Sequence, residues 1–194
     1  MSRLQAAVEA ISAGELVVYP TETVYGLGAD ALDPAAIDRV FAIKGRDRSN
    51  PLSMAVPSVP AAFEYVRVTD RERRFMAQFL PGPVTVLCRR RESVPDALVA
   101  GRNRVGIRVP DHARALRLCE RVGRPITATS ANVSGRPSVR HPDDLDPEIR
   151  KAVAVVVDGD TTPGTESTVV DPSTGEVHRR GALAPAIERW FAAN

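Results

Sequence analysis

The chain has 194 residues, 43% of them hydrophobic, and a formal net charge of +2. This length fits one domain with a sizeable core, so we expect residues 1–194 to form a single unit, and so weak a positive charge does not require nucleic acid or membrane as a partner. The N-terminus lacks the apolar stretch of a signal peptide and no apolar run could cross a bilayer, which predicts a cytoplasmic protein without membrane contact.

Helices are expected where apolar residues recur at every third or fourth position, and strands where short apolar runs lie between turn residues. The helices are expected between Ser2 and Gly14, from Asp33-Pro34 onward, from a cap at Asp70 to 80, and at 113–122 and 184–191. The strands are expected at 16–19, 52–56, 84–88, 105–109, 126–129, 153–157, 168–171 and 177–179, with 27–32 as strand or loop and 134–147 as a polar loop. The interleaving predicts the α/β (α+β) class, with one twisted, open, mixed sheet flanked by helices.

Polar segments follow several of the expected strands, at 21–23, 44–50, 129–132 and 165–168. Each alone is explained by the preference of Ser, Thr and Asn for caps and turns. Ligands of open α/β sheets bind beside strand ends, so four such segments together favour one binding cleft.

Lys44 is one of only two lysines among the 26 basic residues. A lysine is a compact point charge suited to one phosphate oxygen, whereas the fork of Arg46 suits a bidentate grip. Their spacing around a glycine, with Asn50 nearby, predicts an anion site and most plausibly a polyphosphate site. An ordinary surface lysine is the alternative, and the spacing alone does not decide between them. The chain has no P-loop sequence, and Cys88 and Cys119 lack the spacing of metal ligands, so no metal site is expected.

Seven short motifs, read in order, give the chain a family resemblance. Residues 19–28, YPTETVYGLG, closely resemble the opening motif of the YrdC/Sua5 family, the threonylcarbamoyl-AMP synthases. The others are KGR with NPL at 44–52, PGPVT at 81–85, RVP at 108–110, TSANVSG at 129–135, STVVD at 167–171 and RG at 180–181. Together they cover nearly the whole chain, and their order makes the resemblance specific. It implies a YrdC-like fold in the short, single-domain form.

The resemblance also implies an activity. Such an enzyme joins L-threonine, bicarbonate and ATP into threonylcarbamoyl-adenylate and releases pyrophosphate, the first step of threonylcarbamoyladenosine formation in tRNA. Threonylcarbamoyl-transferase proteins would act downstream, and weak contact with tRNA is left open. The attacking N-carboxylate is already an anion, so the protein must supply positioning and charge neutralisation rather than a general base. Mg²⁺ is expected with the triphosphate, held by phosphates and water, and no protein ligand for it can be named.

Roles are implied residue by residue where the motifs match. Lys44 and Arg46 would be the catalytic charges, and Arg108 would pair the carboxylate of threonine. Contacts with ATP are implied for Lys44, Arg46, Asn50, Ser130, Asn132, Arg140 and Arg180, and contacts with threonine for Thr23, Arg108, Ser130 and Ser167.

Two positions depart from the family pattern. Ala55 stands where many members have a histidine, so threonine would have to be held otherwise if that histidine helps to hold it. Asp47 replaces a common proline, where its carboxylate could orient Arg46 or Arg48 or face solvent.

Two other functions are compatible with parts of the sequence. An RNA-binding module is permitted by the mild basicity and by the arginine run at 89–91, which more simply solvates a strand end. It lacks an aromatic stacking set and a recognised RNA-binding motif. A role with carbamoyl-adenylate in hydrogenase maturation is less favoured, because that role usually belongs to a much longer chain.

Overall fold

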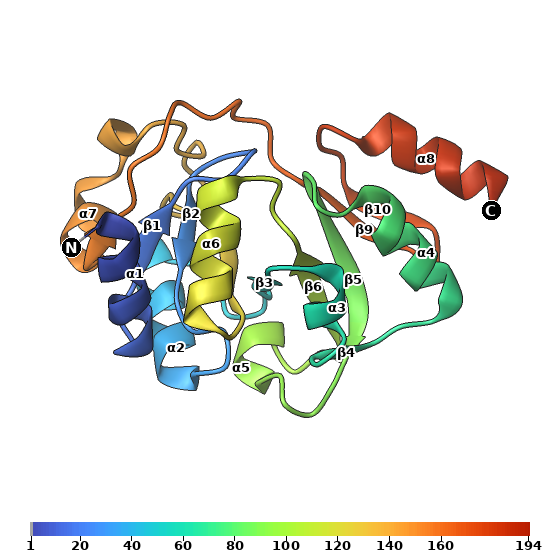
Figure 1. Ribbon diagram of the computed structural model, residues 1–194, viewed down its shortest axis with the longest axis horizontal. Helices are drawn as coiled ribbons and strands as arrows, with labels where there is room; N and C mark the ends of the chain where they lie inside the picture. The colour runs from blue at the N-terminus through green and yellow to red at the C-terminus, as the bar shows by residue number, and fades with distance from the viewer. Residues whose placement is uncertain (1) are drawn as a thin grey trace.

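A computed structural model describes residues 2–194 of the chain. Its strands are β1 (Val17–Tyr19), β2 (Gly26–Gly28), β3 (Ser53–Ala55), β4 (Val66–Arg67), β5 (Val84–Arg90), β6 (Arg104–Arg108), β7 (Ile126–Ser130), β8 (Val155–Val156), β9 (Thr168–Asp171) and β10 (Glu176–Arg179). Across the described residues they form one sheet in the order β10-β9-β5-β6-β3-β7-β2-β1-β8, with β4 paired to β5 (Figure 1). The pairs β1–β8, β3–β6 and β5–β9 are parallel and the rest antiparallel, so the mixed sheet is confirmed.

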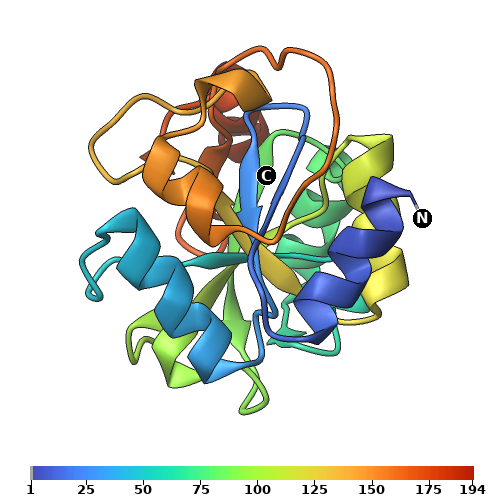
Figure 2. The ribbon, with the colours of Figure 1, turned by 90° about the vertical axis from the view of Figure 1, so that its left-hand side faces the viewer.

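Helices cover both faces of this sheet. They are α1 (Arg3–Ser12), α2 (Pro34–Lys44), α3 (Val59–Ala62), α4 (Asp70–Phe79), α5 (Asp96–Val99), α6 (Ala113–Val122), α7 (Pro147–Ala152) and α8 (Ala184–Ala193), with a 3-10 turn η1 (Pro142–Asp144). Helices α1 and α6 lie beside each other on one side of the strands, and α2 lies on the other side (Figure 2). Within residues 2–194 no helix combines the length and the apolar character needed to cross a membrane.

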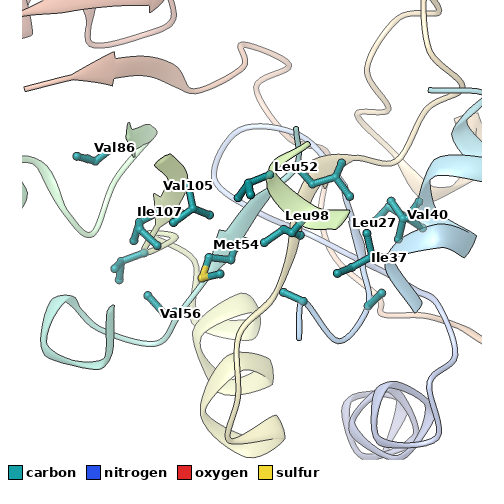
Figure 3. Packing of buried hydrophobic residues seen from close by; sticks show 14 of the residues in the cluster. Leu27, Ile37, Val40, Leu52, Met54, Val56, Val86, Leu98, Val105 and Ile107 are labelled. Carbon is teal, nitrogen blue, oxygen red and sulfur yellow. The ribbon is translucent and has the colours of Figure 1, made fainter. Parts of the chain in front are cut away.

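The larger hydrophobic core fills the face of the sheet that α2 covers. Val86 of β5 and Ile107 of β6 point into it together with Met54 of β3, and Ile37 and Val40 pack onto it from α2 (Figure 3). Side chains alternate between the two faces of a strand. The residues that flank these core positions on β5 and β6 therefore face the opposite side of the sheet.

A smaller core lies on that opposite side, beneath α1 and α6. Ile11 of α1 and Leu118 of α6 pack there against Tyr19 of β1, Ala55 of β3 and Ile126 of β7. Strands β5, β6 and β9 contribute nothing to this smaller core. The two helices thus cover only part of this face, and the side chains of the remaining strands on it are left free to line a cavity.

The α/β architecture agrees with the sequence, but some local boundaries do not. Asp70 was expected to cap α4, and this is wrong, because the cap is Thr69. The Thr69 hydroxyl accepts a hydrogen bond from the Glu72 amide at 3.2 Å, and the Thr69 amide donates to the Glu72 carboxylate at 2.7 Å. This reciprocal capping box satisfies two amides at once, which a cap at Asp70 would not achieve. The short elements α3, β4, α5 and α7 went unpredicted, since two to six residues carry too little periodicity to detect.

Candidate active site

A cavity of about 700 Å³ opens on the part of the sheet face that α1 and α6 leave uncovered. Alternate residues of two strands form its floor: Thr85 and Leu87 of β5, and Arg104, Gly106 and Arg108 of β6. Its charged lining consists of Lys44, Arg46, Arg102, Arg104, Arg108, Arg136 and Arg179, against Glu166. A cavity of this size suits a small-molecule substrate, and the excess of cations favours an anionic one.

Gly106, in the middle of β6, keeps the floor of this cavity open. A Cβ atom at this position would lie 2.3 Å from the Ser53 Oγ and 2.8 Å from the Thr85 Cγ2. Both distances are far below van der Waals contact. A larger residue would therefore displace neighbouring strands or fill the space between Arg104 and Arg108.

Lys44 ends α2 and points across to the loop that follows β7. Its side chain is buried, and the ammonium donates to the carbonyl of Asn132 at 2.6 Å and to the carbonyl of Ser130. Burial, reinforced by the nearby charge of Arg46, lowers the pKa of Lys44 to about 8. An ammonium has three donors, so one remains for an anion in the cavity.

Arg46 follows Gly45, which ends the helix in the left-handed conformation with a φ of 55°. Its guanidinium donates to the carbonyl of Asn50 at 2.9 Å and to that of Pro51 at 3.0 Å, which closes the loop 46–51 on itself. Burial, and the charge of Arg179 next in size, lower the pKa of Arg46. Both cations are withdrawn from water and lie near a like charge, so an anion that enters the cavity would stabilise their charged forms.

A tight turn after β1 holds the hydroxyl of Thr23 against Arg108. The Thr21 hydroxyl donates to the carbonyl of Val24 at 2.6 Å and lies 2.9 Å from the Thr23 hydroxyl. Arg108 contacts the Thr23 hydroxyl from both terminal nitrogens, at 3.3 and 3.4 Å. It also forms a buried ion pair with Glu22, at 2.6 Å between Nη2 and Oε1. Sequence reasoning missed Glu22, although it lies inside the opening motif.

The opposite wall is held together by Ser167. Its hydroxyl lies 2.9 Å from the hydroxyl of Thr85 and accepts from Arg179 Nη2 at 3.0 Å. Arg179 also pairs with Glu166, whose other oxygen accepts from the Ser138 hydroxyl at 2.6 Å. These contacts hold four separate segments of the chain together on one side of the cavity.

Asn132 has an unused acceptor at the cavity. Its amide nitrogen donates to the carbonyls of Val133 at 3.0 Å and Arg136 at 2.7 Å, which fixes the orientation of the side chain. Its Oδ1 is buried and has no hydrogen-bond partner within residues 2–194. A buried unsatisfied acceptor costs free energy, and a ligand donor in the cavity would remove that cost.

The cavity gathers most of the residues that the sequence singled out. Thr23, Lys44, Arg46, Asn50, Arg108, Ser130, Asn132 and Ser167 all line it. Arg140 and Arg180 do not: Arg140 donates to the carbonyl of Thr162 at 3.1 Å, and Arg180 pairs with Glu188 on α8. The assigned contacts with ATP and threonine stay predictions.

Arg179, the neighbour of Arg180, lines the cavity instead. A bulge in the β9–β10 pair shifts the register between Val177 and Arg179, so that Arg179 stands opposite the cavity-lining residue Val169. A strict strand alternation could not have identified this switch. Arg102, Arg104 and Arg136 also line the cavity, although they lie outside the segments and motifs that suggested a ligand. Glu166 lines it from the polar segment 165–168, where no role was assigned to it.

The structure locates the two departures from the family pattern. Ala55 is buried in the smaller core and stands beside Arg108 in the parallel β3–β6 pair. Asp47 is exposed and accepts a hydrogen bond from the Ser49 amide at 2.8 Å, which lowers its pKa. Arg48 pairs with Asp38 rather than with Asp47. Asp47 therefore shapes the loop and orients neither arginine.

A model of the Sua5/YciO/YrdC domain family, described as "Telomere recombination", matches residues 9–181. The chain belongs to the Sua5/YciO/YrdC family. Among its relatives, the threonylcarbamoyl-AMP synthase of Pyrococcus abyssi is 39% identical over 87% of this chain and 50% of its own length. That of Photobacterium profundum is 28% identical over 93% of this chain and 100% of its own length. The chain thus spans half the length of the first relative and the whole length of the second.

Solved structures of this family agree with the fold. P. abyssi Sua5 in complex with L-threonine superposes with a TM-score of 0.87 at 36% identity, over 96% of this chain and 56% of that one. Escherichia coli YciO superposes with a TM-score of 0.86 at 26% identity, over 94% and 91% of the two chains. A HypF structure at 19% identity has a TM-score of 0.77 and shares the fold alone.

Proposed function

We propose that this chain forms L-threonylcarbamoyl-adenylate from L-threonine, bicarbonate and ATP, with release of pyrophosphate, as the first step of threonylcarbamoyladenosine formation in tRNA. The names of the relatives support this activity, and the threonine complex of P. abyssi Sua5 supports the amino acid. A separate transferase protein would consume the adenylate.

One observation carries the proposal. A single cavity holds a group of cations around Lys44 and Arg46 and, on β6, Arg108, which is flanked by the hydroxyl of Thr23. The first arrangement suits the phosphates of ATP, and the second suits the carboxylate and hydroxyl of a small amino acid. ATP and L-threonine, two of the three proposed substrates, would therefore each have a matching place within one cavity.

The reaction would proceed without a general base from the protein. The amine of threonine and bicarbonate give an N-carboxylate and water. A carboxylate oxygen then forms a bond to the α-phosphorus of ATP while the bond from that phosphorus to the bridging oxygen of pyrophosphate breaks. Arg108 and Thr23 would orient the threonine, and Lys44 and Arg46 would neutralise the charge that develops on the phosphates.

A magnesium ion would accompany the triphosphate in the proposed reaction. No group of three or more His, Cys, Asp or Glu side chains in residues 2–194 is arranged to bind a metal ion. We therefore expect any Mg²⁺ to be held by the triphosphate and water, as this ion commonly is.

Release of pyrophosphate tests the proposal directly. The purified protein is incubated with ATP in four mixtures, with and without L-threonine and with and without bicarbonate. We expect release only when both are present. Release that ignores threonine, or no release in the complete mixture, would rule the proposed activity out.

The RNA-binding alternative loses part of its sequence support, because two of the three arginines at 89–91 bind backbone carbonyls. In the run at 89–91, Arg90 donates to the carbonyls of Val94 and Arg102, and Arg91 donates to those of Phe63 and Val66. These guanidinium groups hold loops together rather than facing a partner. A titration of tRNA at several salt concentrations would separate weak backbone contact, which falls steeply with salt, from the activity.

A further inference from the structure

The cations of the cavity fall into two groups according to what holds them. Lys44, Arg46 and Arg102 are held by backbone carbonyls, and within residues 2–194 none of them pairs with a carboxylate. The other four are held by carboxylates: Arg136 pairs with Asp146, Arg179 pairs with Glu166, and the remaining two are the arginines on β6. Arg104 lies 3.0 Å from Glu72 and 2.8 Å from Asp171, and Arg108 lies 2.6 Å from Glu22.

This difference in partners sets the local charge. A carbonyl dipole fixes a cation in place but leaves its full charge for a ligand, whereas a carboxylate cancels it. The carbonyl-held cations lie around the loop 46–51, and the lining carboxylate near them, Glu166, is itself paired with Arg179. That end of the cavity therefore keeps a net positive charge. The subsite at Arg108 is close to neutral before any substrate binds.

Glu22 is well placed to set this charge. Its side chain is 14% exposed and that of Arg108 is 10% exposed, so water screens their interaction little. Glu22 binds through Nη2, while Nη1 makes only a 3.4 Å contact with Thr23. One edge of the guanidinium therefore stays available for a carboxylate that enters the cavity.

We propose that Glu22 is a specificity-determining residue. Its carboxylate compensates the positive charge of Arg108, so that this subsite binds a zwitterionic amino acid and rejects phosphate. A zwitterion needs only a local donor for its carboxylate, whereas a phosphate group with several charges needs a net positive site. Glu22 thereby keeps the triphosphate at the Lys44 end and leaves the Arg108 end for threonine. This inference rests on the proposed function.

Glu22→Gln tests it, since this change removes the charge and keeps the shape. Binding of pyrophosphate is measured by calorimetry with and without saturating L-threonine. In the wild type we expect threonine to leave pyrophosphate binding unchanged. In E22Q we expect a second equivalent of pyrophosphate to bind at least about tenfold more tightly than in the wild type, because a nearby like charge is gone. Threonine should displace that second equivalent.

Two further variants separate charge from architecture. Glu22→Asp keeps the charge and should reject pyrophosphate as the wild type does. Glu15→Gln removes an exposed carboxylate that lies 3.6 Å from Arg39. It changes the net charge of the protein by the same amount as Glu22→Gln, but outside the cavity, so this variant should bind pyrophosphate as the wild type does.

The outcomes distinguish the inference from the proposed function. If E22Q loses threonine binding without gaining the second pyrophosphate, Glu22 only holds the side chain of Arg108 in position, and the inference is wrong. If E22D accepts the second pyrophosphate, the charge is not the cause, and the inference is equally wrong. Failure of the wild type to release pyrophosphate in the complete reaction mixture would instead overturn the proposed function, and with it the premise of the inference.

Discussion

Lys44 should take up a proton when a triphosphate binds above neutral pH. The gap between its ordinary pKa of 10.5 and its lowered value of about 8 corresponds to about 3 kcal/mol that the ammonium loses on burial. An anion placed beside the ammonium restores this stabilisation and raises the pKa again. At pH 9 the free protein then carries roughly a tenth of a proton on Lys44, and the complex carries nearly a whole one.

The measurement is the heat of ATP binding, in the absence of threonine, in two buffers of different ionisation enthalpy. The difference between the buffers gives the number of protons taken up. We expect close to one proton at pH 9 and almost none at pH 6.5, where Lys44 is already charged. Affinity for ATP should fall as the pH rises above about 8.

The only other lysine supplies the control. Lys151 is exposed, so Lys151→Met should leave the uptake unchanged, whereas Lys44→Met should abolish it. Equal heats in both buffers at pH 9, or a full proton in K44M, would refute the argument. The pH dependence of the stability of the free protein gives a second check on the direction of the Lys44 pKa shift. The unfolded chain binds more protons between pH 8 and 10.5, so Lys44 makes folding more favourable as pH rises through that window.

Three further changes have defined outcomes. Gly106→Ala forces a Cβ to 2.3 Å from the Ser53 Oγ, and should lower the free energy of unfolding by about 1–3 kcal/mol and weaken ligand binding, as seen by denaturant unfolding and calorimetry. Thr69→Ala breaks the capping box and should cost about 1 kcal/mol, a fall in Tm of about 2–4 °C, without changing activity. Burial raises the pKa of Cys119 to about 12 and also raises that of Cys88, so at pH 8 a thiol reagent should react quickly only after unfolding. Rapid labelling of the folded protein would contradict that burial.

Site residues that lie close together along the chain could be predicted from the sequence. Lys44, Arg46 and Asn50 lie within seven residues of one another, so their convergence needed only a loop after a helix. The contact between Lys44 and the carbonyls of 130 and 132 joins segments more than 80 residues apart, and no local signal reports it. The family resemblance bridged that gap, because it carried information about which distant segments meet.

Site residues whose position depends on strand register or on burial could not be predicted from the sequence. Arg179 reaches the cavity only because a bulge moves it opposite Val169, while Arg180 turns away to Glu188. Glu22 reads in the sequence as one polar residue among several in a turn. Its proposed role depends on the low exposure of its pair with Arg108, which only the folded structure reveals.

The use of lysine at position 44 in a chain with 24 arginines follows from this geometry. The carbonyls of Ser130, the last residue of β7, and of Asn132, in the loop that follows, converge on a single nitrogen atom. A tetrahedral ammonium can donate to both and still direct a third hydrogen at a ligand, whereas a planar guanidinium spreads its donors over a wider fork. Arginine at this position would keep the charge but not the shape of the loop that carries Asn132. The two carbonyls, rather than the ligand alone, therefore account for the lysine.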